Sequence, residues 1–310
     1  MLFVPTLLGT SLFIFLLLRI VPGDIAAVIL SGPTGDGHYT PEQHAKLTKD
    51  LGLDRHILIQ YADWIWDVAK GDLGQSYTTR RDIAPSLKAK FPITMQLAIF
   101  SFFSVAAFGI PIGVLAAVRQ DSWIDFVLRG WAILGLAMPT FLVGLLVILY
   151  LSTQLRWMPP VGFTHLWENP VISFQQLIIP AIALGFSSNG ILLRMTRTQM
   201  LEVLRDDFVR TARAKGLAER IVIWRHALRN ALLPVVTTLG GLMGGLLTGT
   251  VVIELIFSVP GVGATLVQAI LNRDLGVVQV YVLYFAFMAL VVNLIVDITY
   301  AWLDPRIRYD

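Results

Sequence analysis

Residues 93–118 read ITMQLAIFSFFSVAAFGIPIGVLAAV, a stretch without a single charged side chain. A helix needs about 20 largely apolar residues to cross the hydrocarbon core of a bilayer, because that core is about 30 Å thick and a helix rises only about 1.5 Å per residue. This stretch is long enough to do so. It therefore predicts a transmembrane helix.

Further charge-free runs of similar length lie on both sides of this stretch. They cover residues 1–18, 130–155, 169–193, 230–253 and 275–296. We therefore expect an all-α membrane protein with six transmembrane helices. The first run has no basic residues before it and no small-residue cleavage site after it, so we interpret it as an anchor and not as a removable signal peptide.

One more apolar run, residues 255–272, is interrupted by Ser258-Val259-Pro260-Gly261-Val262-Gly263. It is too short and too broken to cross a membrane cleanly. We expect it to form a short external or re-entrant helix.

The composition is that of a membrane protein and excludes several kinds of chemistry. Of the 310 residues, 55% are hydrophobic and 15% are charged, against about 25% charged in soluble domains. The chain has no cysteine, so it has no disulfides and no cysteine-ligated metal. It also lacks the nucleotide motif G-x-x-x-x-G-K-[ST] and the zinc motif H-E-x-x-H. We expect no catalytic residue, cofactor or metal in this chain, and all its histidines in loops: His38, His44, His56, His165 and His226.

The distribution of basic residues predicts the orientation in the membrane. The segment 194–230 is by far the most basic of the short connections, and cytoplasmic loops carry the excess of Lys and Arg. With six spans, both termini then lie in the cytoplasm and the segment 22–92 lies outside. The basic residues of segment 194–230 are the following: Arg194, Arg197, Arg205, Arg210, Arg213, Lys215, Arg220, Arg225 and Arg229.

The external segment is predicted to be helical. Thr40 and Gln43 match a capping box, with Pro41 at the first helical position. Gly71-Asp72-Leu73-Gly74 predicts a turn at its end. Between them, an apolar stripe at helical spacing, with two aromatic residues, is expected to pack on the protein or at the membrane interface, with direct ligand contact as the alternative. It consists of Ile57, Tyr61, Trp64, Ile65 and Val68.

Ionisable residues near the spans leave a second class of function open. Arg19, Glu254 and Asp297 would be costly in hydrocarbon and should face protein or water. They could form a proton relay, which would make the chain a secondary transporter that needs no ATPase. Their expected positions near helix ends favour structural roles instead, because relay carboxylates usually lie near the midplane.

Small residues and prolines inside the runs indicate where helices pack closely or bend. The fifth run is rich in glycine, which suits either close helix packing or a pliable wall of a solute pathway. We take the following as candidate pathway residues: Met138, Pro139, Asn189, Gly241, Gly245 and Asn293.

The basic segment has an internal pattern that a lipid anchor does not require. A short helix rich in small residues is stopped by Gly216 and followed by a second helical run to Leu233-Pro234. We expect this helix to enter a groove of a partner, with Ala212 on the small-residue face and Gly216 at positive φ. The alternative is a scaffold that merely attracts anionic lipids.

This segment resembles the cytoplasmic loop of inner-membrane permeases of ATP-binding-cassette (ABC) importers, whose signature is Glu-Ala-Ala, three residues, Gly, and later Leu-Pro. Here Arg210-Thr211-Ala212 stand at the start, and Gly216 and Leu233-Pro234 match the rest. The arginine and the longer spacing depart from the general signature. Both departures are similar to the dipeptide/oligopeptide/nickel branch, as is the stretch 224–234.

The resemblance covers nearly the whole chain. Five other stretches are similar to the B-type permease of that branch, although the basic N-terminal elbow usual there is missing before Phe3, which leaves the natural start of the chain open. These stretches are Val21-Pro22-Gly23-Asp24, Gly71-Asp72-Leu73-Gly74, Ala137-Met138-Pro139-Thr140-Phe141, the range 256–263 and Leu303-Asp304-Pro305-Arg306.

The resemblance implies a type I ABC importer permease fold in the inner membrane. It implies a first helix at 1–21, an external segment at 22–92, a transmembrane domain at 93–303 with a coupling loop at 194–230, and a cytoplasmic tail at 304–310. It also implies three kinds of protein partner: a second homologous permease, two ATPases that use ATP and Mg, and an external solute-binding protein. It implies no role for nucleic acid.

The branch to which this resemblance points leaves the solute open among dipeptides, longer peptides, nickel chelates, glutathione, opines and some sugars. The residues expected to couple the chain to the ATPases are the following: Arg210, Thr211, Ala212, Arg213, Ala214, Lys215, Gly216 and Leu217.

Overall fold

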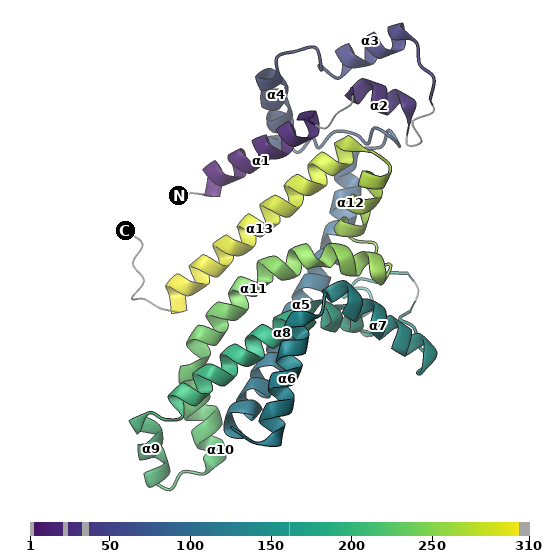
Figure 1. Ribbon diagram of the computed structural model, residues 1–310. Helices are drawn as coiled ribbons and strands as arrows, with labels where there is room; N and C mark the ends of the chain where they lie inside the picture. The colour runs from purple at the N-terminus through teal and green to yellow at the C-terminus, as the bar shows by residue number, and fades with distance from the viewer. Residues whose placement is uncertain (1–2, 21–23, 33–36, 161, 304–310) are drawn as a thin grey trace. The chain divides into compact units, whose positions relative to one another are not determined.

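A computed structural model of the chain describes residues 3–20, 24–32, 37–160 and 162–303. Within these ranges the regular structure is helical, with an isolated bridge between Gln75 and Asp82 and no strand (Figure 1). The chain divides into two compact units, which are residues 1–94 with 260–291, and residues 95–259 with 292–310. The expected all-α fold is confirmed.

The first unit contains the external segment of the sequence prediction. Thr40 and Gln43 form the expected capping box, because each side chain accepts from the backbone N–H of the other residue. The helices of this unit are α1 (Phe3–Ile20), α2 (Ile25–Ser31), α3 (Pro41–Asp50), α4 (Ile57–Ala69), α12 (Val262–Leu271), and the first parts of α5 (Ile83–Val118) and α13 (Leu275–Leu303).

The apolar stripe of α4 packs on α1. The Phe15 ring lies 5.6 Å from the Tyr61 ring and 5.8 Å from the Trp64 ring, measured between centroids. The Tyr61 hydroxyl also donates to the carbonyl of Leu8 at 3.2 Å. Packing, and not ligand contact, therefore accounts for Tyr61 and Trp64, as the sequence favoured.

The interrupted run 255–272 contains a short helix, as expected. Helix α12 begins directly after Pro260-Gly261, where the missing proline N–H and the extended backbone of Gly261 separate it from α11. The Val262 N–H donates to Thr94 Oγ1 at 2.9 Å, which ties the start of α12 to α5.

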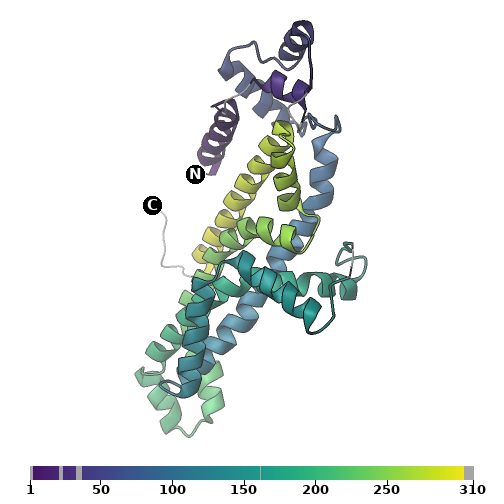
Figure 2. The ribbon, with the colours of Figure 1, turned by 45° about the vertical axis from the view of Figure 1, so that its right-hand side comes forward.

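The second unit is a helical bundle whose core is built from the remaining helices. Helices α8 and α11 run side by side in both views (Figure 1 and Figure 2), and α6 packs along α8. Fully buried aliphatic side chains such as Leu97, Leu192 and Ile253 fill the space between helices. The helices are α6 (Trp123–Ala137), α7 (Thr140–Thr153), α8 (Pro170–Val203), α9 (Asp207–Ala214), α10 (Glu219–Ile221), a π-helical turn (Val222–Ala227) and α11 (Leu228–Ile256).

Glycines bring the helices of this bundle unusually close. A Cβ atom on Gly113 of α5 would lie 2.6 Å from the Thr196 Cβ of α8, and one on Gly190 of α8 would lie 2.6 Å from the carbonyl oxygen of Ala132 in α6. No side chain fits in so short a distance, so these contacts require glycine.

The run 130–155, expected to form one span, consists of two helices in the structure. Helices α6 and α7 meet at Met138-Pro139 with a bend of 111°. Both residues have extended backbone, and Pro139 has no N–H to continue the hydrogen bonds of α6. Pro139 inside this run predicts a bend, but the sequence does not give its size.

Helices long and apolar enough to cross a membrane occur at 83–118, 170–203, 219–256 and 275–299 in the described part of the chain, and the bent α6–α7 pair would add a fifth span. Helix α1 is shorter, with its apolar part at Phe3–Arg19. The chain is therefore a multi-pass membrane protein. The number six stays a prediction.

The expectation that all histidines lie in loops is wrong for two of them. His44 lies inside α3, and His226 lies inside the π-helical turn. In both cases the neighbouring residues form the helix, and the weak helix propensity of one histidine is not enough to interrupt it. The tail 304–310 and parts of two motifs, at 21–23 and 304–306, lie outside the described residues.

Candidate coupling segment and solute pathway

The basic segment 194–230 is largely helical and not an open loop. Helix α8 continues past Leu193 to Val203, a short turn leads into α9, and α10 and the π-helical turn lead into α11. Only residues 204–206 and 215–218 lie outside helices. The segment is thus a rigid connection between α8 and α11.

A Schellman motif ends α9. The N–H of Gly216 donates to the carbonyl of Arg213 at 2.9 Å, and the N–H of Leu217 donates to that of Ala212 at 3.4 Å. Gly216 has a φ of 76°, in the left-handed region that favours glycine. The expected glycine cap with positive φ is confirmed.

An ion pair closes the turn after α9. Arg213 donates to both carboxylate oxygens of Glu219, from Nε at 3.1 Å and from Nη2 at 2.7 Å. The hydrogen bonds from Glu219 hold the pKa of Arg213 above its ordinary value. The two-pronged contact fixes the angle between α9 and α10 better than a single contact could.

The expected direction of the Ala212 side chain is wrong. Ala212 is only 7% exposed, and together with Val209 it packs against residues of α5, α8, the π-helical turn and α11. Its small size lets α9 lie flat on the chain's own core. The sequence showed a small-residue face, but it did not show whether that face meets this chain or a partner.

The face of α9 that remains exposed is a different one. Phe208 is 40% exposed, and Thr211, Ala214 and the following Leu217 are also exposed. At about 100° per residue, Phe208, Thr211 and Ala214 spread over about a third of the way around α9, and Leu217 follows the end of the helix. Together with the exposed Arg210 and Lys215, these residues form the surface that α9 presents; we call Phe208, Thr211, Ala214 and Leu217 the outer face of α9.

Replacing Ala212 with leucine is therefore expected to destabilise the chain itself. The added atoms would overpack a filled core, which typically costs about 1–3 kcal/mol. The same substitution at Ala214, which is exposed, is the matched control and should leave stability unchanged. Thermal unfolding of both purified variants in detergent measures the difference; equal stability would contradict the packing of Ala212.

A groove of about 440 Å³ lies between α8 and α11 in the second unit. Gly241 and Gly245 line it, as expected for pathway residues, and a Cβ atom on Gly245 would meet nothing within 4 Å. Gly245 thus leaves space open here, whereas a Cβ on Gly249, which lines the same groove, would lie 2.8 Å from Leu184 Cδ1 of α8. The sequence analysis did not single out the hydroxyl groups that line the same groove, which are those of Thr140, Ser187, Ser188 and Thr248.

The other candidate pathway residues lie around this groove without lining it. Met138 and Pro139 form the bend that leads directly into Thr140. Asn189 follows the groove residue Ser188, and its Oδ1 is buried with no hydrogen-bond partner among the described residues. Asn293 Oδ1 lies 3.8 Å from the position of a Cβ on Gly244.

One buried ion pair was not expected from the sequence. Asp125 of α6 is 0% exposed and accepts two hydrogen bonds from Arg197 of α8, both at 2.7 Å. It also accepts from the backbone N–H of Asp121 at 3.0 Å. Asp125 lies just before one apolar run and Arg197 just after another, where charged residues usually mark the ends of a span. The sequence therefore shows no sign that they pair.

The ionisable residues considered for a proton relay have unlike surroundings. In the second unit, Glu254 is fully buried, whereas Asp297 is exposed. In the first unit, the Arg19 guanidinium lies over the Phe15 ring, 4.9 Å from its centroid. The described surroundings do not set these residues out as one chain of proton carriers.

Comparison with known proteins gives matches along the whole chain. Residues 109–309 match the family model "Binding-protein-dependent transport system inner membrane component", and residues 3–98 match its N-terminal counterpart. The chain is 40% identical to the dipeptide transport system permease protein DppB of Escherichia coli (strain K12), over 99% of this chain and 96% of that protein. It is 39% identical to the di/tripeptide transport system permease protein DppB of Pseudomonas aeruginosa (strain UCBPP-PA14), with the same shares covered.

The fold also matches a solved structure. A crystal structure of an amino acid ABC transporter with histidines superposes with a TM-score of 0.52 at 14% identity, over 70% of this chain and 94% of that one. At this identity the match concerns the fold alone. With the family matches over most of its length, the chain belongs to the inner membrane components of binding-protein-dependent transport systems, the permease subunits of ABC importers.

Proposed function

We propose that this chain forms half of the pathway by which short peptides enter the cell. Its full-length relatives from Escherichia coli and Pseudomonas aeruginosa are permeases for dipeptides and for di- and tripeptides. The groove between α8 and α11 suits such a solute, because its hydroxyl groups can donate to and accept from peptide groups of any sequence, and Gly245 leaves room beside them.

The observation that carries the mechanism is the position of α9 in the chain. Helix α8 runs from Ser187 and Ser188 in the groove to Val203, and α11 carries the opposite wall from Gly241 onward. Helix α9 is the connection between these two walls and is held rigidly by its Schellman motif and by Arg213 with Glu219. A partner that moves α9 would therefore move both walls.

The partners follow from this mechanism. A second homologous permease completes the pathway, and an external solute-binding protein delivers the peptide. Two cytoplasmic ATPases hydrolyse ATP with Mg, and one of them binds the outer face of α9. The chain itself binds no nucleotide. It lies in the inner membrane with both termini in the cytoplasm, which places segment 194–230 inside, as its excess of arginine and lysine favours.

Reconstitution tests this function. Proteoliposomes with both permeases, the ATPases and the binding protein should take up labelled dialanine only when ATP is present, and the chain alone should neither hydrolyse ATP nor take up dialanine. Proton-driven uptake by the chain alone would contradict the proposal and restore the secondary-transporter interpretation.

A single cysteine at Ala214 tests the contact with the ATPases and the orientation together, because the native chain has no cysteine. It should crosslink to a cysteine in the cognate ATPase and should not react with an impermeant thiol reagent added outside intact cells. A cysteine at the buried Val209 is the control and should do neither. Labelling of Ala214→Cys from outside would reverse the orientation.

A further inference from the structure

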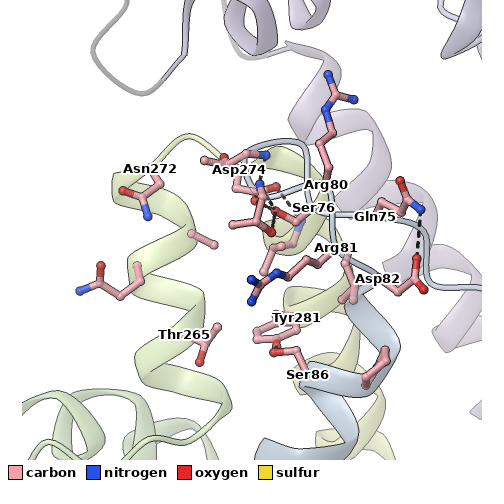
Figure 3. A pocket seen from close by; sticks show the side chains of 17 residues that line it. Gln75, Ser76, Arg80, Arg81, Asp82, Ser86, Thr265, Asn272, Asp274 and Tyr281 are labelled. Atoms are coloured by element: carbon pink, nitrogen blue, oxygen red, sulfur yellow. Dashed lines mark hydrogen bonds between the residues drawn. The ribbon is translucent and has the colours of Figure 1, made fainter.

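A pocket of about 710 Å³ opens in the first unit, which contains neither the groove nor α9. Its walls are the turn 75–82 with the start of α5 on one side, and α12 with the start of α13 on the other (Figure 3). All of these belong to the same compact unit. Nothing in the proposed transport path uses this pocket.

A buried carboxylate holds the rim of the pocket in place. Asp274 is 4% exposed and accepts hydrogen bonds from the Ser76 hydroxyl and from the backbone N–H groups of Tyr77, at 3.1 Å, and Thr78, at 3.4 Å. It thereby ties the turn 75–82 to the start of α13. The rim is preformed, so a ligand would not have to order it on binding.

Arg81 points into the pocket. In Figure 3 its guanidinium reaches toward α12 above Thr265 and Tyr281, whereas the Arg80 side chain points away. Arg81 forms no ion pair within the described residues. The nearest acid in sequence, Asp82, instead accepts from Gln75 Nε2 at 3.0 Å.

Below Arg81, the pocket is lined by the hydroxyl groups of Thr265, Ser86 and Tyr281. Lys90 Nζ donates to Thr265 Oγ1 at 2.6 Å, and the hydroxyls of Ser86 and Tyr281 lie 3.0 Å apart. A guanidinium that is free to bond in two prongs, with hydroxyl donors below it, is the arrangement that binds a carboxylate.

The surroundings favour a protein carboxylate over a small molecule. Arg80 and Arg81 line the pocket and are exposed, and they outnumber the exposed Asp82. Arg80 and Arg273 have φ angles of 57° and 54°, in the left-handed region that non-glycine residues rarely adopt, so the backbone here is strained to hold this shape. An exposed guanidinium with a second arginine beside it complements an acidic protein surface.

We propose that this pocket receives an aspartate or glutamate side chain of the external solute-binding protein, with Arg81 as its ion-pair partner. This inference rests on the proposed function, which places the first unit's turn 75–82 on the side that the binding protein approaches. The exposed arginines would steer the encounter. Arg81 would then hold the docked protein outside the membrane by two hydrogen bonds to one carboxylate.

The test measures the affinity of the peptide-loaded binding protein for the assembled transporter in nanodiscs. Arg81→Gln should weaken binding by about tenfold or more, chiefly through faster dissociation, and Arg81→Lys should lie between that variant and the wild type because it cannot bond in two prongs. Lys88→Gln removes an exposed cation of α5 outside the pocket and should bind like the wild type. Basal ATP hydrolysis without binding protein should be unchanged in all three, which shows that they fold.

Three outcomes would overturn the inference. Wild-type affinity of Arg81→Gln would do so directly. Equal losses in Arg81→Gln and Lys88→Gln would reduce the effect to general charge. The third outcome combines two measurements. If saturation-transfer NMR shows that free dialanine contacts the wild-type transporter but not Arg81→Gln, and the affinity for the binding protein is unchanged, the pocket binds free peptide. A wild-type complex that imports no dialanine would instead overturn the proposed function.

Discussion

Replacing Arg197 with methionine is expected to lower the stability of the chain by about 3–5 kcal/mol, because it leaves the Asp125 carboxylate buried without its main partner. The only other nearby cation is Arg129, whose Nε lies 3.5 Å from Asp125 Oδ1, beyond good hydrogen-bonding distance among the described contacts. The loss of thermal stability in detergent, read by size-exclusion chromatography after heating, measures the effect.

Two variants separate the ion pair from general effects of charge. Arg194→Met removes an exposed arginine from the same helix and should cost little. The double variant Asp125→Leu with Arg197→Met should recover most of the loss, because replacing both partners of a buried pair with apolar residues is often neutral. A double variant no more stable than Arg197→Met would show that the pair itself is favourable and would contradict this explanation.

Replacing Gly216 with valine is expected to abolish transport while the chain still inserts into the membrane. A Cβ on Gly216 would meet nothing within 4 Å, so the substitution does not crowd a neighbour. The backbone φ of 76° is instead unfavourable for a β-branched residue, at a cost of about 1–3 kcal/mol. The turn can relieve that strain by giving up its Schellman bonds, which would tilt α9 and misplace its outer face. Dialanine uptake and peptide-stimulated ATP hydrolysis by the reconstituted complex measure the loss.

Asparagine supplies the control at this position, because it adopts the left-handed conformation far more readily than valine does. Gly216→Asn should keep most of the transport activity. If both variants transport normally, the turn after α9 does not transmit motion. If both fail equally, the glycine is needed for space at a partner contact and not for its backbone conformation.

Several features of this protein follow from the sequence by itself. The apolar runs determine that the chain is helical and spans a membrane, because a bilayer leaves a backbone few other ways to satisfy its hydrogen bonds. Local chemistry also sufficed for the capping box at Thr40, for the short helix after Pro260-Gly261 and for the positive φ of Gly216. Each of these depends on residues within a few positions of one another.

Only the tertiary structure decided which faces meet which neighbours. The sequence marks Ala212 as small, yet it took the packing of α9 on the core to show that this side chain points inward. Asp125 and Arg197 are 72 residues apart in the chain, and the charges at the ends of two apolar runs carry no sign that they meet. The space beside Gly245 is of the same kind, since it needs a facing helix that stays clear. Contacts between distant segments depend on the path of the whole chain, which no local pattern of residues contains.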